Sequence, residues 1–454
     1  MQTELTRWKA LLKMAWPLIV ANSFWNIQLT IDRVFLGSFS TEALGAAMAV
    51  MGVFWVPMAL LQQTASYVTT FVAQYFGANE HQKIGACLWQ ALYVSVVGGV
   101  LFLAFNFFSA GFFEKVGHAP SIQALEVEYF NALAYSALPT AIVAAVSGFY
   151  TGLGKTSMVM KINFVGLIFN VILDYAMIFG HFGFPRLGVA GAGYATAIAT
   201  YFGAFYGLWR LFRRENEAAY RVFSDRRWNP PLLRQFLRYG LPSGLQWALE
   251  GLAFTVFLII MGRLHNGEAA LASSSIAVTV MMLSVLPTMG VAQAVLTLVG
   301  QRMGEKSPDR AAVCTWDGVK ISSIYMGVIA LTFWLVPEFY LAWFKNEQNP
   351  ALWAEVSRLV PTLLKVVGVF TIFDSIYLNI SFALKGAGDT RFVSLVALTV
   401  PWPLMVLPAY LVSGYDRAVE LAWIFAVGYS MTTTSILWLR FRQGKWRSMS
   451  VIQI

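Results

Sequence analysis

Long, nearly uncharged runs of about 20 residues recur along this chain, and a run of that length can cross a lipid bilayer as a helix. Apolar residues make up 58% of the sequence and charged residues only 12%. An average soluble protein carries about 25% charged residues. Since the strands of a membrane barrel would alternate over about 10 residues, the near-continuous runs predict an all-α polytopic membrane protein.

Counting runs of helix length predicts about twelve transmembrane helices. An even number of spans places both ends of the chain on one side of the membrane. Arg and Lys gather in alternate connections, which include Lys83, Lys155, Arg302 and Lys385. The positive-inside rule makes that side the cytoplasm. We therefore expect a multi-pass protein of the cell (inner) membrane with both termini cytoplasmic.

Two motifs occur once in each half of the chain. "VAQYFGANEHQKIGA" resembles "VGQRMGEKSPDRAAV", so that Gln74 and Gly77 recur as Gln301 and Gly304. "GFYTGLGKTS" and "SFALKGAGDT" form a second pair of similar stretches. Such self-similarity indicates an internal repeat.

The repeat predicts a division of the chain into two similar bundles of six helices. We place the N-terminal bundle at residues 1–212, a cytoplasmic linker at 213–232 and the C-terminal bundle at 233–454. Because each half has an even number of spans, the copies share one orientation, and a pseudo-twofold axis along the membrane normal should relate them. This organisation is typical of transporters.

Acidic residues inside the spans are the strongest functional signal, because a charged Asp or Glu at membrane depth costs about 2.5–3.5 kcal/mol. In the first half these are Asp32 and Asp174. Gln28 and Asn170 each precede one of them by a helical turn, so an amide and a carboxylate could bind one cation together.

The acids of the second half, Glu250 and Asp374, have aromatic neighbours one turn away. A face that combines an acid with aromatic surface suits a bulky organic cation as well as a proton or a sodium ion. The predicted substrate-binding residues of the two halves are Gln28, Gln246, Trp247, Phe370 and Tyr377.

Other conspicuous residues have structural interpretations. Arg33 points about 100° away from Asp32 around the helix, which indicates a snorkelling or interhelical side chain. Pro17 predicts a helix kink that could act as a hinge. The histidines, His81, His118, His181 and His265, fall in predicted loops, which argues against a buried histidine acid–base centre.

These residues stand in stretches that resemble the multidrug and toxic compound extrusion (MATE) transporters over essentially the whole chain. The stretches are "WPLIVANSFWNIQLTIDRVFLG", "VAQYFGA", "NVILDYAMIFG", "LGVAGAGYATAIAT", "LPSGLQWALEGLAF" and "FDSIYLNISFALKGAGDTRF". The resemblance implies twelve helices in two bundles, and export of cationic, often aromatic compounds in exchange for protons or sodium ions. It implies no cofactor beyond that coupling ion.

Carried over residue by residue, the resemblance assigns Asp32, Asn170, Asp174 and Thr196 to a cation site in the first bundle, which would also be the sodium site. It makes Pro17 the bend of the first helix. Glu250 and Asp374 would be a second cation-coupling pair, as in the NorM-like branch. Phe370 stands where NorM-type proteins often have a Tyr, and Arg33 stands where many members of the family have a small polar residue.

The alternative within the same superfamily is a flippase for lipid-linked oligosaccharides, whose pyrophosphate would require several cavity-facing Arg or Lys residues. An intramembrane enzyme would need a buried nucleophile, histidine or metal-ligand cluster, and the sequence shows none, so we expect no enzymatic activity. The basic residues form no nucleic-acid motif. The expected partners are small cationic compounds and membrane lipid, and the expected state is a monomer.

Overall fold

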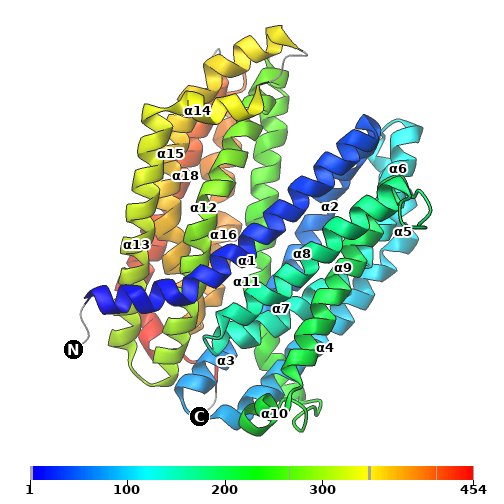
Figure 1. Ribbon diagram of the computed structural model, residues 1–454. Coiled ribbons are helices and arrows are strands. Elements are labelled where there is room, and N and C mark those ends of the chain that lie inside the picture. The colour runs from blue at the N-terminus through cyan, green and yellow to red at the C-terminus, as the bar shows by residue number, and fades with distance from the viewer. Residues whose placement is uncertain (1–3, 265, 346–348, 416, 453–454) are drawn as a thin grey trace. The chain divides into compact units, whose positions relative to one another are not determined.

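The computed structural model describes residues 4–264, 266–345, 349–415 and 417–452, and all regular secondary structure in these ranges is helical (Figure 1). Short helical turns connect some of the helices: η1 (His81–Lys83), η2 (Ala342–Phe344), η3 (Trp402–Val406) and η4 (Lys445–Ser448). The α-helices, in chain order, are α1 (Glu4–Phe39), α2 (Thr41–Ser66), α3 (Val68–Gly77), α4 (Ile84–Ala104), α5 (Asn106–Val116), α6 (Pro120–Ala134), α7 (Ala137–Gly152), α8 (Thr156–Phe179), α9 (Gly188–Leu211), α10 (Arg214–Tyr220), α11 (Pro230–Gly262), α12 (Gly267–Gly304), α13 (Pro308–Leu335), α14 (Pro337–Leu341), α15 (Pro350–Ala387), α16 (Thr390–Thr399), α17 (Leu407–Leu411) and α18 (Ala418–Arg442).

Ten helical segments of the described ranges are long and apolar enough to cross a membrane. The long helices α1 and α9 lie outside that set, and together the twelve contain every span that the sequence predicts. The all-α polytopic fold class is therefore confirmed. The candidate span Thr390–Leu411 is interrupted by the π-helical turn η3, which contains Pro403 and follows Pro401. Proline lacks the N–H that a regular α-helix needs.

Local sequence signals set the ends of α15, the helix that carries Asp374 and Tyr377. The side chain of Asn349 accepts a hydrogen bond from the N–H of Leu352, and Pro350 occupies the first turn. These are favoured residues at a helix N-terminus. Gly388 ends the helix with φ 108°, a left-handed conformation that glycine adopts without a steric penalty.

The described residues group into two compact units. Unit 1 comprises the described parts of Met1–Ala15, Leu249–Val299 and Pro308–Met449. Unit 2 comprises those of Trp16–Ala248, Gly300–Ser307 and Ser450–Ile454. Helices α1, α11 and α12 each contribute to both units. The predicted boundaries at 212 and 233 refer to the sequence repeat and stay a prediction.

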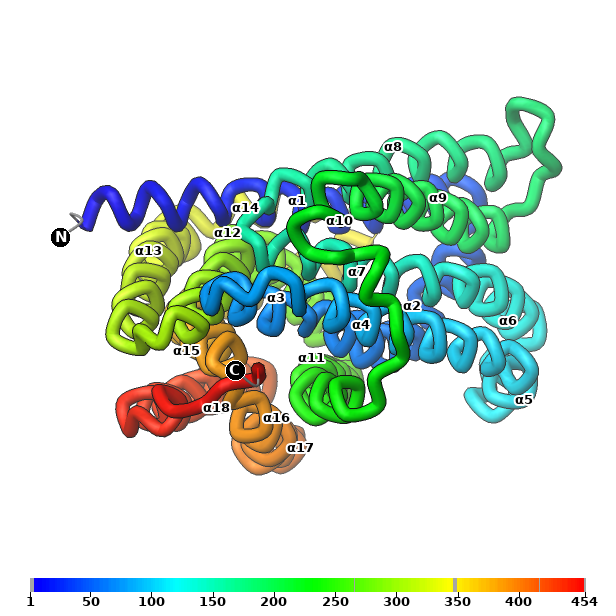
Figure 2. The backbone as a smooth tube through the Cα atoms, turned by 90° about the horizontal axis from the view of Figure 1, so that it is seen from below, coloured from blue at the N-terminus to red at the C-terminus, as the bar shows by residue number. Residues whose placement is uncertain are grey.

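Each unit has its own aromatic and aliphatic core. In unit 1, α13, α15 and α18 lie side by side, and Phe257 meets Trp423 edge to face with ring centroids 5.5 Å apart. In unit 2, α8 and α9 run side by side in both views (Figure 2). Elsewhere in unit 2, Phe54 of α2 and Phe102 of α4 pack edge to face with ring centroids 5.0 Å apart. These cores hold the polar residues of each unit in fixed positions.

The structure corrects two details of the sequence analysis. The predicted set of acids inside spans was too small, because Glu126 of α6 and Asp317 of α13 are also buried within helices. Lys385 was assigned to a cytoplasmic connection, but it lies within α15 and is 2% exposed. Both errors arise because charged residues near the end of a span look like loop residues in sequence.

Candidate functional site

The first acidic cluster lies in unit 2, where three helices bring together the residues assigned to the first cation site. Asp32 comes from α1, Asn170 and Asp174 from α8, and Thr196 from α9. All are buried, with exposed fractions of 6% for Asp32 and Thr196 and 0% for Asn170 and Asp174. Asn170 Nδ2 donates a hydrogen bond to Thr196 Oγ1 at 3.3 Å, which links α8 to α9.

The carboxyl groups of Asp32 and Asp174 lie within interaction range of each other and of Asn170. Four buried oxygens of this cluster accept no hydrogen bond from any described residue: Asp32 Oδ1, Asn170 Oδ1 and both carboxyl oxygens of Asp174. Burying such atoms without partners is costly. A proton or a bound cation would satisfy them, and carboxylate, amide and hydroxyl oxygens are the donors that hard cations prefer.

Tyr129 of α6 also belongs to this cluster, although the sequence analysis did not select it. Its side chain is 4% exposed, and its phenol group lies near the carboxyl groups of both Asp32 and Asp174. No sequence pattern marks it, because α6 is distant in the chain from both acids. Gln28 is buried one turn before Asp32, whereas Arg33 is exposed, as its position around the helix predicts.

The second acidic cluster lies in unit 1, between α11, α15 and α18. The hydroxyl of Tyr377 donates a hydrogen bond to Glu250 Oε1, which joins α15 to α11. Asp374, on the same helix as Tyr377, interacts electrostatically with Glu250. Tyr429 of α18 is 8% exposed and interacts with both acids. The two predicted acids and Tyr377 are thus brought together, and Tyr429 is an addition.

Lys385 is the other residue of this cluster that the sequence analysis missed as a site residue. Its ammonium lies 4.0 Å from the centroid of the Phe382 ring, and it interacts electrostatically with Glu250. Lys385 follows Asp374 by three helical turns, within about 20° of the same face. That spacing is a usable sequence signal once Lys385 is assigned to the helix and not to a loop.

The remaining predicted residues have varied positions. Phe370 is 3% exposed and packs edge to face on Phe254, at a centroid distance of 6.2 Å, within the core of unit 1. Gln246 is buried and Trp247 is partly buried, one turn before Glu250 on α11. Pro17 is buried within an unbroken α1, next to the point where that helix passes from unit 1 to unit 2. Hinge motion at Pro17 stays a prediction.

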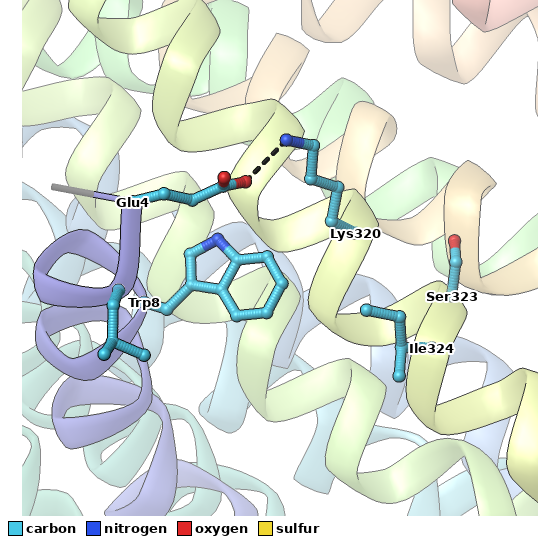
Figure 3. Close-up of a pocket in the computed structure, with 6 residues that line it drawn as sticks. Glu4, Trp8, Lys320, Ser323 and Ile324 are labelled. Atoms are coloured by element: carbon cyan, nitrogen blue, oxygen red, sulfur yellow. Dashed lines mark hydrogen bonds and ion pairs between the residues drawn. The ribbon is translucent and has the colours of Figure 1, made fainter.

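A separate shallow pocket in unit 1 lies between the first turns of α1 and the middle of α13 (Figure 3). Lys320 Nζ contacts Glu4 Oε1 at 2.6 Å across it, and the Trp8 indole forms part of its wall. None of the predicted site residues lines this pocket. Within the described ranges, no three His, Cys, Asp or Glu residues group as a metal site.

Comparison with known proteins identifies the family and several relatives. The MatE family model matches residues 17–176 and 242–411, which is most of the chain and falls in both halves. The chain is 26% identical over 448 residues to a probable multidrug resistance protein NorM of Thermotoga maritima, covering 98% of this chain and 94% of the relative. It is 29% identical over 435 residues to a probable multidrug resistance protein NorM of Xanthomonas campestris, covering 95% and 93%.

Solved structures share the fold. A crystal structure described as MATE in complex with MaL6 matches with a TM-score of 0.88 and 20% identity, covering 98% of each chain. A structure from Pyrococcus furiosus, described as a transporter of the MOP superfamily whose binding pocket of reverse polarity suggests a different function, also matches with a TM-score of 0.88 and 20% identity, covering 98% of this chain and 97% of that one.

Proposed function

We propose that this chain, which belongs to the MatE family, is a NorM-like multidrug efflux transporter that exports small organic cations in antiport with protons or sodium ions. The observation that carries this proposal is the set of buried, unpartnered oxygens at Asp32, Asn170 and Asp174. Buried oxygens without partners favour a bound proton or cation, and a transporter can exchange one cation for another at that position.

The antiport follows from competition for the same carboxylates. When a proton or sodium ion neutralises Asp32 and Asp174, an organic cation nearby loses an attraction that is strong in a medium of low dielectric constant. The organic cation then dissociates more easily. If one conformation binds the ion better and another binds the organic cation better, the two gradients become linked.

Unit 1 has its own set of charges and aromatic surfaces, which also suits an organic cation. Glu250 and Asp374 offer carboxylates, while Tyr377 and Tyr429 offer ring surface beside them. Aromatic faces attract organic cations by about 2 kcal/mol or more when water is excluded. The proposed substrate contacts of unit 1 are Phe370 and Tyr377, and those of unit 2 are Gln28, Gln246 and Trp247.

The spans and the basic residues of alternate connections support a location in the cell (inner) membrane with cytoplasmic termini. The relatives are named as multidrug resistance proteins, so the proposed cargo is small compounds. We propose a monomer with membrane lipid around it. The proposed sodium ligands are Asp32, Asn170, Asp174 and Thr196.

The test is transport by purified protein in proteoliposomes, using ethidium as a fluorescent organic cation. A proton gradient and a sodium gradient are imposed separately on the wild type, Asp32→Asn and Asp174→Asn. We expect transport driven by at least one gradient, and a loss of at least about tenfold in either variant, since each removes a charge in a buried site.

Asp309→Asn is the matched control, because Asp309 is an exposed acid paired with Arg447 at 2.6 Å. It should transport like the wild type. Gradient-driven transport that persists in both site variants would contradict the coupling role. Folded wild-type protein that transports ethidium under neither gradient would instead favour the flippase and a lipid-linked anion as cargo.

A further inference from the structure

Lys385 is a buried cation inside a protein that we propose to carry cations. Its side chain is 2% exposed, and the Phe382 ring lies 4.0 Å from its ammonium. Burying an ammonium in such a place without a nearby negative charge is strongly unfavourable. Glu250 is a negative charge near enough to attract Lys385.

Glu250 is shared between three groups on α15. Its carboxylate accepts a hydrogen bond from the Tyr377 hydroxyl and interacts electrostatically with both Asp374 and Lys385. Asp374 and Lys385 lie on one face of α15, with about 16 Å of helix between their Cα atoms. Lys385 therefore approaches Glu250 from the C-terminal end of α15, while Asp374 approaches it from the middle of the membrane span.

The charges of this cluster determine how much positive charge it can accept. Two carboxylates together would attract two monovalent cations or one dication. With the ammonium of Lys385 present, the ionised cluster carries a net charge of −1. One monovalent cation is then enough to neutralise it.

We propose that Lys385 is a tethered counter-cation that limits the second acidic cluster to a single added positive charge and keeps its affinity low enough for release. This inference rests on the proposed function and adds a charge specificity to it. Lys385 acts through Glu250, so it is a positioning residue for the cargo and does not need to touch it.

A charge attached to the chain differs from a bound ion in that it cannot dissociate. A free ion at that position would be lost whenever the site opened to water. An ammonium on α15, held over the Phe382 ring, stays beside Glu250 in every conformation that keeps α11 and α15 packed.

The test is equilibrium binding to purified protein of two probes: tetraphenylphosphonium, an aromatic monocation, and a bis-quaternary aromatic dication. In Lys385→Met the site gains one net negative charge. We expect the monocation to bind about tenfold tighter and the dication about 100-fold tighter than in the wild type. Release of the monocation should slow in proportion.

Lys385→Arg should bind both probes within about twofold of the wild type, because it keeps the charge. Lys365→Met is the matched control, since Lys365 is an exposed lysine on the same helix. The double variant Glu250→Gln/Lys385→Met removes one charge of each sign, and its preference between dication and monocation should return toward the wild-type value. It also keeps the proposal testable if Lys385→Met alone does not fold.

The inference is overturned if Lys385→Met, or the double variant relative to Glu250→Gln alone, shows no change in the preference for the dication. It is also overturned if Lys385→Arg behaves like Lys385→Met, because the charge would then be irrelevant. A wild-type protein that binds neither probe would contradict the proposed function itself, and the two failures are therefore distinguishable.

Discussion

Gly77 lies directly against the backbone of Gln301, so closely that a Cβ atom at Gly77 would sit 1.9 Å from the Gln301 carbonyl oxygen. The contact is reciprocal, because a Cβ at Gly304 would lie 2.0 Å from the Gln74 carbonyl oxygen. Both contacts belong to unit 2, where the end of α3 meets the end of α12. The residues that repeat in sequence are therefore also the residues that meet in space.

Alanine at either glycine should destabilise the protein. The clash involves backbone atoms, which cannot rotate away, so Gly77→Ala and Gly304→Ala should each lower the thermal midpoint by at least about 2–4 °C. The measurement is thermal unfolding in detergent, followed by size-exclusion chromatography.

Gly52→Ala in α2 is the control, because a Cβ at Gly52 would meet no atom within 4 Å. There, alanine should leave the midpoint unchanged or raise it, since alanine favours a helix over glycine by about 1 kcal/mol. Equal midpoints for all three variants would show that the close crossing of α3 and α12 does not contribute to stability.

Thr196→Val tests the hydroxyl in the first acidic cluster. The change keeps the shape of the side chain but removes the oxygen that accepts the hydrogen bond from Asn170 at 3.3 Å. Losing one hydrogen bond of about 1 kcal/mol should raise the concentration of the coupling ion needed for half-maximal transport by about fivefold. The measurement is ethidium transport in proteoliposomes at a series of ion concentrations.

Thr200→Val is the matched control, because the Thr200 hydroxyl bonds only to the Thr196 carbonyl among the described residues, one turn along α9. Its ion dependence should match the wild type. An unchanged ion dependence in Thr196→Val would remove Thr196 from the cation site.

Asp317 anchors the first turns of α1 to α13 within unit 1. Its carboxylate accepts hydrogen bonds from Arg7 Nε at 2.7 Å and from the Trp8 indole at 3.1 Å. Asp317→Ala removes the acceptor of both hydrogen bonds, so amide hydrogen exchange over residues 4–15 should accelerate by about tenfold.

Lys9→Ala serves as the control, since Lys9 is exposed on the same segment. It should exchange like the wild type. Unaltered exchange in Asp317→Ala would mean that apolar packing alone holds this segment.

Glu217 makes the loop after α10 sensitive to pH. Hydrogen bonds from the Ser224 hydroxyl and from the N–H groups of Phe223, at 2.6 Å, and Ser224, at 3.3 Å, lower the pKa of Glu217. Because the pKa is lower when the loop is folded, the stabilisation is complete above the usual value of about 4.3 and is lost as the pH falls through the lowered value.

A spin label at Arg227 should report constant mobility from about pH 7 to pH 5 and rising mobility at lower pH. Glu217→Gln should be mobile at every pH, while Glu215→Gln, at an exposed position in the same helix, should follow the wild type. A mobility change centred near neutral pH would assign the effect to another group.

Much of the site could be predicted because the length of an apolar run and the free-energy cost of a carboxylate within it can both be read from a single segment of sequence. Runs of apolar residues specified the helices, and the expense of a carboxylate in a membrane singled out Asp32, Asp174, Glu250 and Asp374. The one-turn spacing of Asn170 and Asp174 correctly placed both on one face of α8. These inferences needed no knowledge of which helices are neighbours.

Tyr129, Tyr429 and Lys385 could not be selected in this way, because their roles depend on contacts between helices. Tyr129 and Tyr429 are ordinary aromatic residues until α6 and α18 bring them to the acids. Lys385 resembled a loop lysine until α15 proved long enough to bury it beside Phe382.

The sequence by itself determined the fold class, the number of long helices and the residues whose burial demands a function, because each follows from the properties of one segment. Only the tertiary structure decided which charges meet. The attraction between Glu250 and Lys385 depends on the distance between two helices, and packing of side chains sets that distance.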